Sequence, residues 1–154
     1  MSETTTADPG TWIRGITIRQ PWTTCILAGK DVENRPAAWS WRGLVLLHAG
    51  QATERAPMLD PLVATAIRSR SRALHTRAVI GVARLTDCHQ DAAGTAPCSK
   101  WAQADAFHLV LADVQELALP IPWLHGQLGP WRPTRDLVDQ VLLQLPHLAP
   151  EGTS

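Results

Sequence analysis

The sequence predicts an α+β fold, built around a small mixed β-sheet or barrel with flanking helices. The first observation is the order of its apolar patterns, β-α-β-β-α-β-β-α, which holds too few long helices for a doubly wound parallel sheet. The second is size and composition: 154 residues, 45% hydrophobic and 18% charged, suit one domain with one core and exclude a disordered chain.

The first half of the chain predicts three strands and one short helix. Residues 15–19 alternate apolar and polar side chains, which is typical of a strand. Pro21 suits the first position of a helix and Gly29 its end, so a short helix is expected between them. Residues 31–35 form the next strand, and the apolar run at residues 43–49 predicts a strand buried on both faces.

The second half predicts a helix, two strands and a last helix. Asp60 is expected to cap a helix that runs toward Leu74. Strands follow at residues 79–87 and 107–119, the second long enough to bend, and Thr134 caps the last helix. The apolar face of this helix consists of Leu137, Val138, Val141, Leu142 and Leu145. Irregular connections are expected at residues 90–99 and 120–133.

Loose tails are expected at residues 1–11 and 148–154, with a single domain at residues 12–147. The start of the chain holds no apolar signal segment, and no apolar run approaches the ~20 residues of a membrane span. Three widely spaced cysteines argue against a disulfide framework. These features favour a cytoplasmic protein with no membrane partner.

Charge alone does not reveal a partner. The formal net charge is zero, although basic residues prevail in residues 1–77 and acidic ones in residues 78–154. The excess of Arg over Lys suits phosphate contacts, or reflects codon bias in a GC-rich genome. The end of the helix after Asp60 carries Arg68, Arg70 and Arg72, which we interpret as a solvated basic face.

A polar cluster is predicted where the first helix meets the second strand. Period-two alternation places Asp31, Glu33 and Arg35 on one face of that strand. Each of them lies ~6.6 Å from the next one along the strand. Lys30 lies at the junction, near Trp22 of the helix. The cluster either forms a ligand site or is an exposed ion-pair strand of the common, weak kind.

Three blocks of this region resemble the opening of an ASCH domain, a branch of the PUA-like superfamily. Residues 16–22 read ITIRQPW, residues 27–35 read LAGKDVENR, and residues 41–49 read WRGLVLLHA. The spaced elements match in order, and looser similarity extends over about residues 13–135. The resemblance implies a PUA-like small mixed β-barrel with a cleft between sheet and first helix. It also implies a partner: RNA, DNA in some branches, or a nucleotide.

The resemblance also implies the residues of the site. The positions carried over are Gln20, Pro21, Trp22, Lys30, Glu33, Arg35 and His48, with Trp131 less securely. Lys30 and Arg35 would hold phosphate or a base edge, with Glu33 orienting Arg35. Gln20 would read a base edge, and Trp22, Trp39 or Trp41 would stack on a base. Structural roles compete: Pro21 as helix start, His48 as a buried histidine, and Trp22 and Trp131 as core.

The alternative implied by the resemblance is a hydrolase. One branch of the superfamily hydrolyses N4-acetylcytidine with a lysine, a threonine and a glutamate. Another member has been proposed as a ribonuclease. Lys30 matches the lysine, but Glu33 stands at the threonine position, so these two would be the catalytic residues of an enzyme acting on RNA or a modified nucleoside. Asp91 and Asp105 are available as the third member, without a convincing match.

No cofactor or metal is predicted. Cys25, Cys88, His89 and Cys98 have the wrong spacing for a zinc finger or ribbon. The sequence contains no glycine-rich phosphate loop and no Gly-x-Ser-x-Gly element.

Overall fold

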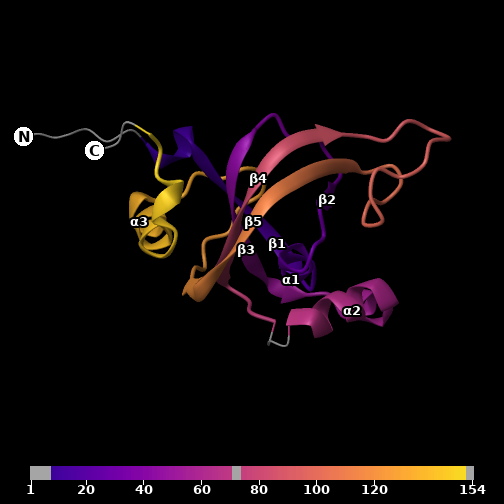
Figure 1. Cartoon of the computed structure of the whole chain (residues 1–154), viewed down its shortest axis with the longest axis horizontal. Helices are drawn as coiled ribbons and strands as arrows, with labels where there is room; N and C mark the ends of the chain where they lie inside the picture. The colour runs from indigo at the N-terminus through magenta and orange to yellow at the C-terminus, as the bar shows by residue number, and fades with distance from the viewer. Residues whose placement is uncertain (1–7, 71–73, 152–154) are drawn as a thin grey trace, which may run out of the picture.

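The computed structural model describes residues 8–70 and 74–151 and confirms an α+β fold with the expected order of elements (Figure 1). Its strands are β1 (Ile13–Gln20), β2 (Val32–Arg35), β3 (Gly43–Thr53), β4 (Ala78–His89) and β5 (Phe107–Pro122). Its α-helices are α1 (Trp22–Leu27), α2 (Pro61–Arg70) and α3 (Arg135–Gln144), and short 3-10 helices occupy Pro9–Thr11, Ala56–Leu59 and Pro146–Leu148.

The five strands form one mixed sheet in the order β1-β3-β4-β5-β2. Only the β1–β3 pair is parallel, and the other three pairs are antiparallel. β1 and β2 lie at opposite edges and share no ladder in the described part of the chain, so the sheet is open and the expected closed barrel is not observed. The long β4–β5 hairpin curves strongly, as Figure 1 shows, and its register shifts repeatedly.

β3 is an interior strand of the sheet, between β1 and β4, and is buried on both faces, as its apolar run predicted. Leu44 and Leu46 pack with α3 in one core, whereas Val45 and Leu47 pack with Ile26 of α1 in another. Alternate residues of a strand point to opposite faces, so a continuous apolar run fills both layers.

The helix ends follow the capping chemistry of the sequence, with two corrections. Thr134 accepts a hydrogen bond from the Leu137 N–H at 3.1 Å, as predicted for an N-cap. Pro21 stands just before α1 rather than inside it. The described part of α2 runs to Arg70, and Leu74, toward which the helix was expected to run, is not helical.

The basic face predicted on α2 is not simply solvated. Arg70 lies half-buried, donates to the Leu27 carbonyl at 3.3 Å and pairs with Glu116 of β5. This contact ties the end of α2 to α1 and β5. Arg72, the third member of the predicted basic face, lies outside the described residues.

The segment after β5 is mostly irregular, as expected, although the strand itself continues to Pro122. Trp131 returns to the sheet and forms a bridge with Gly15 of β1. At the start of the described chain, Asp8 pairs with Arg132 at 2.7 Å. The described helices include none that is both long enough and apolar enough to cross a bilayer.

Candidate functional site

A cleft of about 650 Å³ opens between β1 and β2, the two unpaired edges of the sheet. Both edge strands, α1 and five connections supply its wall, which is composed of Thr17, Arg19, Trp22, Lys30, Glu33, Asn34, Arg35, Pro36, Glu54, Gln103, Gly126, Gln127 and Leu128. Four of the eight positions carried over from the resemblance, Trp22, Lys30, Glu33 and Arg35, therefore lie together here.

Lys30, Glu33 and Arg35 form a continuous chain of charges along one wall. Lys30 Nζ donates to Glu33 Oε1 at 2.7 Å and to the Val32 carbonyl at 2.6 Å. Arg35 Nη2 lies 3.3 Å from Glu33 Oε2. Only 2% of the Lys30 side chain and 9% of the Glu33 side chain are exposed, so this is a desolvated cluster and not an exposed ion-pair strand. Buried charges persist only when they are paired in this way.

Arg35 also spans the gap between the sheet edges. Its Nη2 donates to the Thr17 carbonyl of β1 at 2.9 Å, and its guanidinium lies 5.6 Å from the ring of Trp39. The Nε of Arg35 is buried without a hydrogen-bond partner among the described residues. Arg35 thus holds the two edges together on the floor of the cleft, with part of its hydrogen-bonding capacity unused.

The remaining walls are aromatic and amide-rich. The ring of Trp22 lies 5.5 Å from Lys30 Nζ, which is a cation–π distance. Asn34 accepts from the Gln103 N–H at 2.9 Å and donates to the Trp101 carbonyl at 3.0 Å. Arg19 lies at the rim and pairs with Glu54 at 3.6 Å, with 67% of the Arg19 side chain exposed.

Gln20 does not line this cleft. It is fully buried, and its side-chain amide donates to the His75 carbonyl at 2.8 Å. Its Oε1 accepts from the Thr24 N–H at 3.0 Å, which caps the first turn of α1. Both polar ends of the side chain are therefore used inside the protein.

His48 belongs to a buried polar chain behind the cleft. Its Nε2 donates to the Trp123 carbonyl at 2.7 Å, so its Nδ1 accepts from the Thr17 hydroxyl at 3.0 Å. Trp131 Nε1 in turn donates to Thr17 Oγ1 at 3.0 Å. Burial lowers the pKa of His48 from its ordinary value of 6.5, which favours this neutral form.

The other predicted aromatic and acidic residues have structural contacts. Trp131 is buried, as its core role predicted, and Trp39 packs against the core. Trp41 donates to the Leu44 carbonyl at 3.2 Å and lies beneath the guanidinium of Arg14. Asp31 is not part of the cleft wall and accepts a hydrogen bond from Ser99.

Sequence reasoning missed several residues of the wall. Strand parity placed Asn34 away from Glu33 and Arg35, yet the cleft at an open sheet edge reaches both sides of β2. Gln103 and residues 126–128 come from irregular connections with no periodic signal. Only the curvature of the sheet brings them to this cleft.

No protein-family model matches the chain, and no curated protein matches it significantly. The functional assignment therefore rests on the geometry of the cleft and on the motifs of the sequence.

Proposed function

We propose that this chain is an ASCH-type, PUA-like module of the cytoplasm that binds RNA or a nucleotide in the cleft between β1 and β2. The observation that supports this best is the desolvated chain Lys30–Glu33–Arg35 beside Trp22 in a cleft of about 650 Å³. A buried array of donors and acceptors with one aromatic wall suits a base or nucleotide better than an apolar ligand.

Each wall residue has a physical role in this proposal. Trp22 offers a face on which a base stacks. Glu33 accepts from a base amino group, and its two cationic neighbours fix the direction of the carboxylate. Gln103 and Gln127, which also line the cleft, supply both donors and acceptors to base edges.

Arg19 is the cation best placed to meet a phosphate. Lys30 and Arg35 are already committed to Glu33 at 2.7 and 3.3 Å. Arg19 is exposed, and its 3.6 Å contact with Glu54 is a surface pair of the weak kind. A phosphate at the rim therefore competes with Glu54 for Arg19 at little cost.

The test is binding of a fluorescently labelled pool of single-stranded RNA, measured by anisotropy at two salt concentrations. We expect salt-sensitive binding that weakens at least about 10-fold in Arg35→Ala and several-fold in Arg19→Ala. Arg84→Ala is the matched control, since Arg84 is a half-exposed arginine of β4 outside the cleft and its loss changes net charge equally.

Competition by free nucleoside monophosphates then distinguishes a nucleotide site from an RNA site. Thermal unfolding of each variant shows whether the fold is retained, because Arg35 also bridges the sheet edges. Equal affinity of wild-type protein, Arg19→Ala and a folded Arg35→Ala variant would refute the cleft as the binding site.

The hydrolase alternative keeps one supporting observation, the direct Lys30–Glu33 contact inside the cleft. Against it, Lys30 Nζ already donates to both Val32 and Glu33, and its side chain is 2% exposed. A lysine acting as a base needs a free lone pair and access to substrate. Turnover of RNA or N4-acetylcytidine that disappears in a folded Lys30→Ala variant would establish the enzyme instead.

A further inference from the structure

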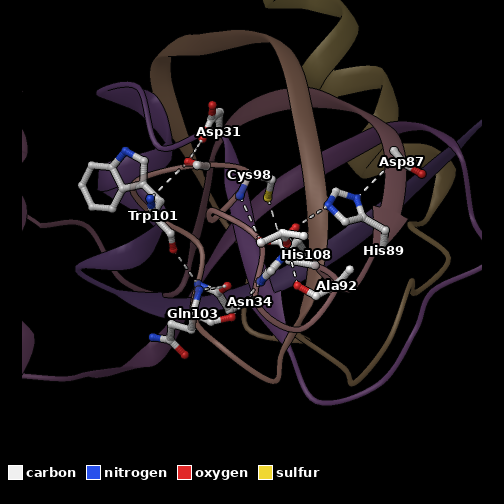
Figure 2. A network of polar contacts seen from close by, with 12 residues as sticks. Asp31, Asn34, Asp87, His89, Ala92, Cys98, Trp101, Gln103 and His108 are labelled. Atoms are coloured by element: carbon white, nitrogen blue, oxygen red, sulfur yellow. Dashed lines mark hydrogen bonds and ion pairs between the residues drawn. The ribbon is translucent and has the colours of Figure 1, made fainter.

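A second group of polar side chains gathers where β4 ends and β5 begins, away from the Lys30 cluster. His89 and His108 are register partners on these two strands, so their side chains are cross-strand neighbours. The connection at residues 90–106 folds back over them and adds Asp91 and Cys98. Figure 2 shows His89, Cys98 and His108 directed toward one another.

The distances match a metal-binding set. One ligand atom from each of the four residues lies within 4.8 Å of all the others. Asp91 Oδ1 is 3.1 Å from His89 Nε2 and 3.5 Å from His108 Nδ1, and Cys98 Sγ is 3.6 Å from His108 Nδ1. Zinc bonds of about 2.0 Å to nitrogen or oxygen and 2.3 Å to sulfur imply tetrahedral ligand separations of roughly 3.3–3.8 Å.

The outer hydrogen bonds orient both imidazole rings. His108 Nε2 lies 2.7 Å from the Gln103 carbonyl, which can only accept, so His108 donates there and its Nδ1 lone pair points into the group. His89 Nδ1 lies 3.0 Å from Asp87 Oδ2, which leaves the Nε2 lone pair pointing at Asp91. A carboxylate or a carbonyl on the far nitrogen is the usual support of a metal-bound histidine.

This arrangement gathers several lone pairs around one weak donor, the Cys98 thiol, which lies 3.6 Å from His108 Nδ1. With each ring donating outward, two imidazole lone pairs face the same Asp91 oxygen, at 3.1 and 3.5 Å. The second Asp91 oxygen accepts from the Cys98 N–H at 2.9 Å, which fixes the carboxylate in this position. Opposed acceptors at these distances repel unless a positive charge lies between them.

We propose that His89, Asp91, Cys98 and His108 bind one zinc ion in a four-ligand structural site. The donor set decides the metal class: a thiolate and two imidazoles suit Zn²⁺, whereas Mg²⁺ and Ca²⁺ prefer oxygen ligands. Four protein ligands leave no open position, which is typical of structural and not catalytic zinc. On binding, the Cys98 thiol gives its proton to solvent and the sulfur coordinates the metal.

Such a site would fasten residues 90–106 to the sheet. Gln103, whose carbonyl orients His108, also lines the cleft and donates its N–H to Asn34. Zinc would therefore stiffen one wall of the cleft. The inference does not depend on the proposed function, because it rests on a separate group of ligands.

The spacing of these residues conceals the site in the sequence. The candidates visible in the sequence are Cys25, Cys88, His89 and Cys98, and their spacing is wrong for a zinc finger or ribbon. In the structure Cys25 is buried in the α1–α2 core, and Cys88 accepts from the Trp39 N–H at 3.5 Å. Asp91 and His108 take the places of these two cysteines.

The test uses the full chain with any histidine tag removed, stripped of metal by chelator and titrated with Zn²⁺ or Co²⁺. We expect one zinc per chain by native mass spectrometry. Co²⁺ should give the visible bands of a tetrahedral site and a thiolate charge-transfer band. Zinc should also raise the midpoint of thermal unfolding.

Cys98→Ser is the decisive variant, because Cys98 is exposed on a connection and its loss should leave the fold intact. We expect it to lose the charge-transfer band and at least about 10-fold in zinc affinity. Cys88→Ser is the matched control and should behave as wild type. Asp91→Asn should weaken zinc binding and Asp105→Asn should not.

Two results would overturn the proposal. One is that wild-type protein takes up no zinc at micromolar concentrations. The other is that Cys98→Ser binds zinc as tightly as wild type and shows the same Co²⁺ spectrum. The first result would mean that no zinc joins these side chains, and the second that Cys98 is not a ligand.

Discussion

Lys30 is the least exposed of the charged side chains in the cleft, and its environment defines the site. A buried ammonium group is tolerated because Glu33, the Val32 carbonyl and the Trp22 ring surround it. Its neighbour Arg35 is only partly buried and reaches across to β1. The two cations that pair with Glu33 therefore have different roles: Lys30 orients Glu33, and Arg35 joins the sheet edges.

Replacing Lys30 with Met should destabilise the fold. The substitution keeps the volume of the side chain and leaves Glu33 buried with Arg35 as its one remaining cation. We expect the free energy of unfolding in urea to fall by about 3 kcal/mol, the loss typical of breaking a buried pair. Arg19→Met, which breaks a surface pair with Glu54, should cost less than about 1 kcal/mol. Similar losses in the two variants would contradict this account.

At the scale of elements, β1 depends on a close approach that only glycine permits. Gly15 exchanges both backbone hydrogen bonds with Trp131, at 2.8 and 3.0 Å, and the indole of Trp131 lies where a Cβ on Gly15 would stand. This contact presses residues 120–133 onto the edge strand. It also places Trp131 to donate to Thr17, which supports His48.

Gly15→Ala should therefore force Trp131 away from β1. We expect the free energy of unfolding to fall by about 1–3 kcal/mol, the cost typical of overpacking a dense core. The double variant Gly15→Ala/Trp131→Ala should lose less than the sum of the single variants, because removal of the indole relieves the overlap. Strict additivity in urea denaturation would show that the contact is not the cause.

At the scale of the whole molecule, burial is concentrated on the central strands, and the polar sites lie at the edges. Apolar cores cover both faces of β3, whereas β2 is a four-residue edge strand. The cleft and the proposed zinc site both lie at the start of β5, where His108 pairs with Asn34 of β2 and with His89 of β4, and Gln103 touches both sites.

Hydrogen exchange should reproduce this division. We expect amides of residues 44–49 to exchange only through global unfolding, because both faces of β3 are covered. Amides of residues 90–106 should exchange by local opening and so much faster. Mass spectrometry of exchanged peptides measures both, and equal protection of the two segments would contradict the expectation.

The sequence by itself determined the elements and the polar cluster. Period-two alternation and capping residues act over a few positions, so the order of strands and helices, the cap at Thr134 and the Glu33–Arg35 pair were all accessible. The continuous apolar run at residues 43–49 also correctly predicted that β3 is buried on both faces. Local signals did not show that Arg70 of α2 pairs with Glu116, because this ion pair joins residues far apart in sequence.

Only the tertiary structure determined which polar side chains line the cleft and which are used inside the protein. The open order β1-β3-β4-β5-β2 creates the cleft between two sheet edges, whereas the sequence favoured a closed barrel. The tertiary structure directs the Gln20 side chain inward, where it caps α1, and it gives His48 two internal hydrogen-bond partners. It also joined His89 to His108 across the β4–β5 ladder. Long-range strand pairing has no short-range signature, and so the ligands that it assembles become visible only when the sheet is formed.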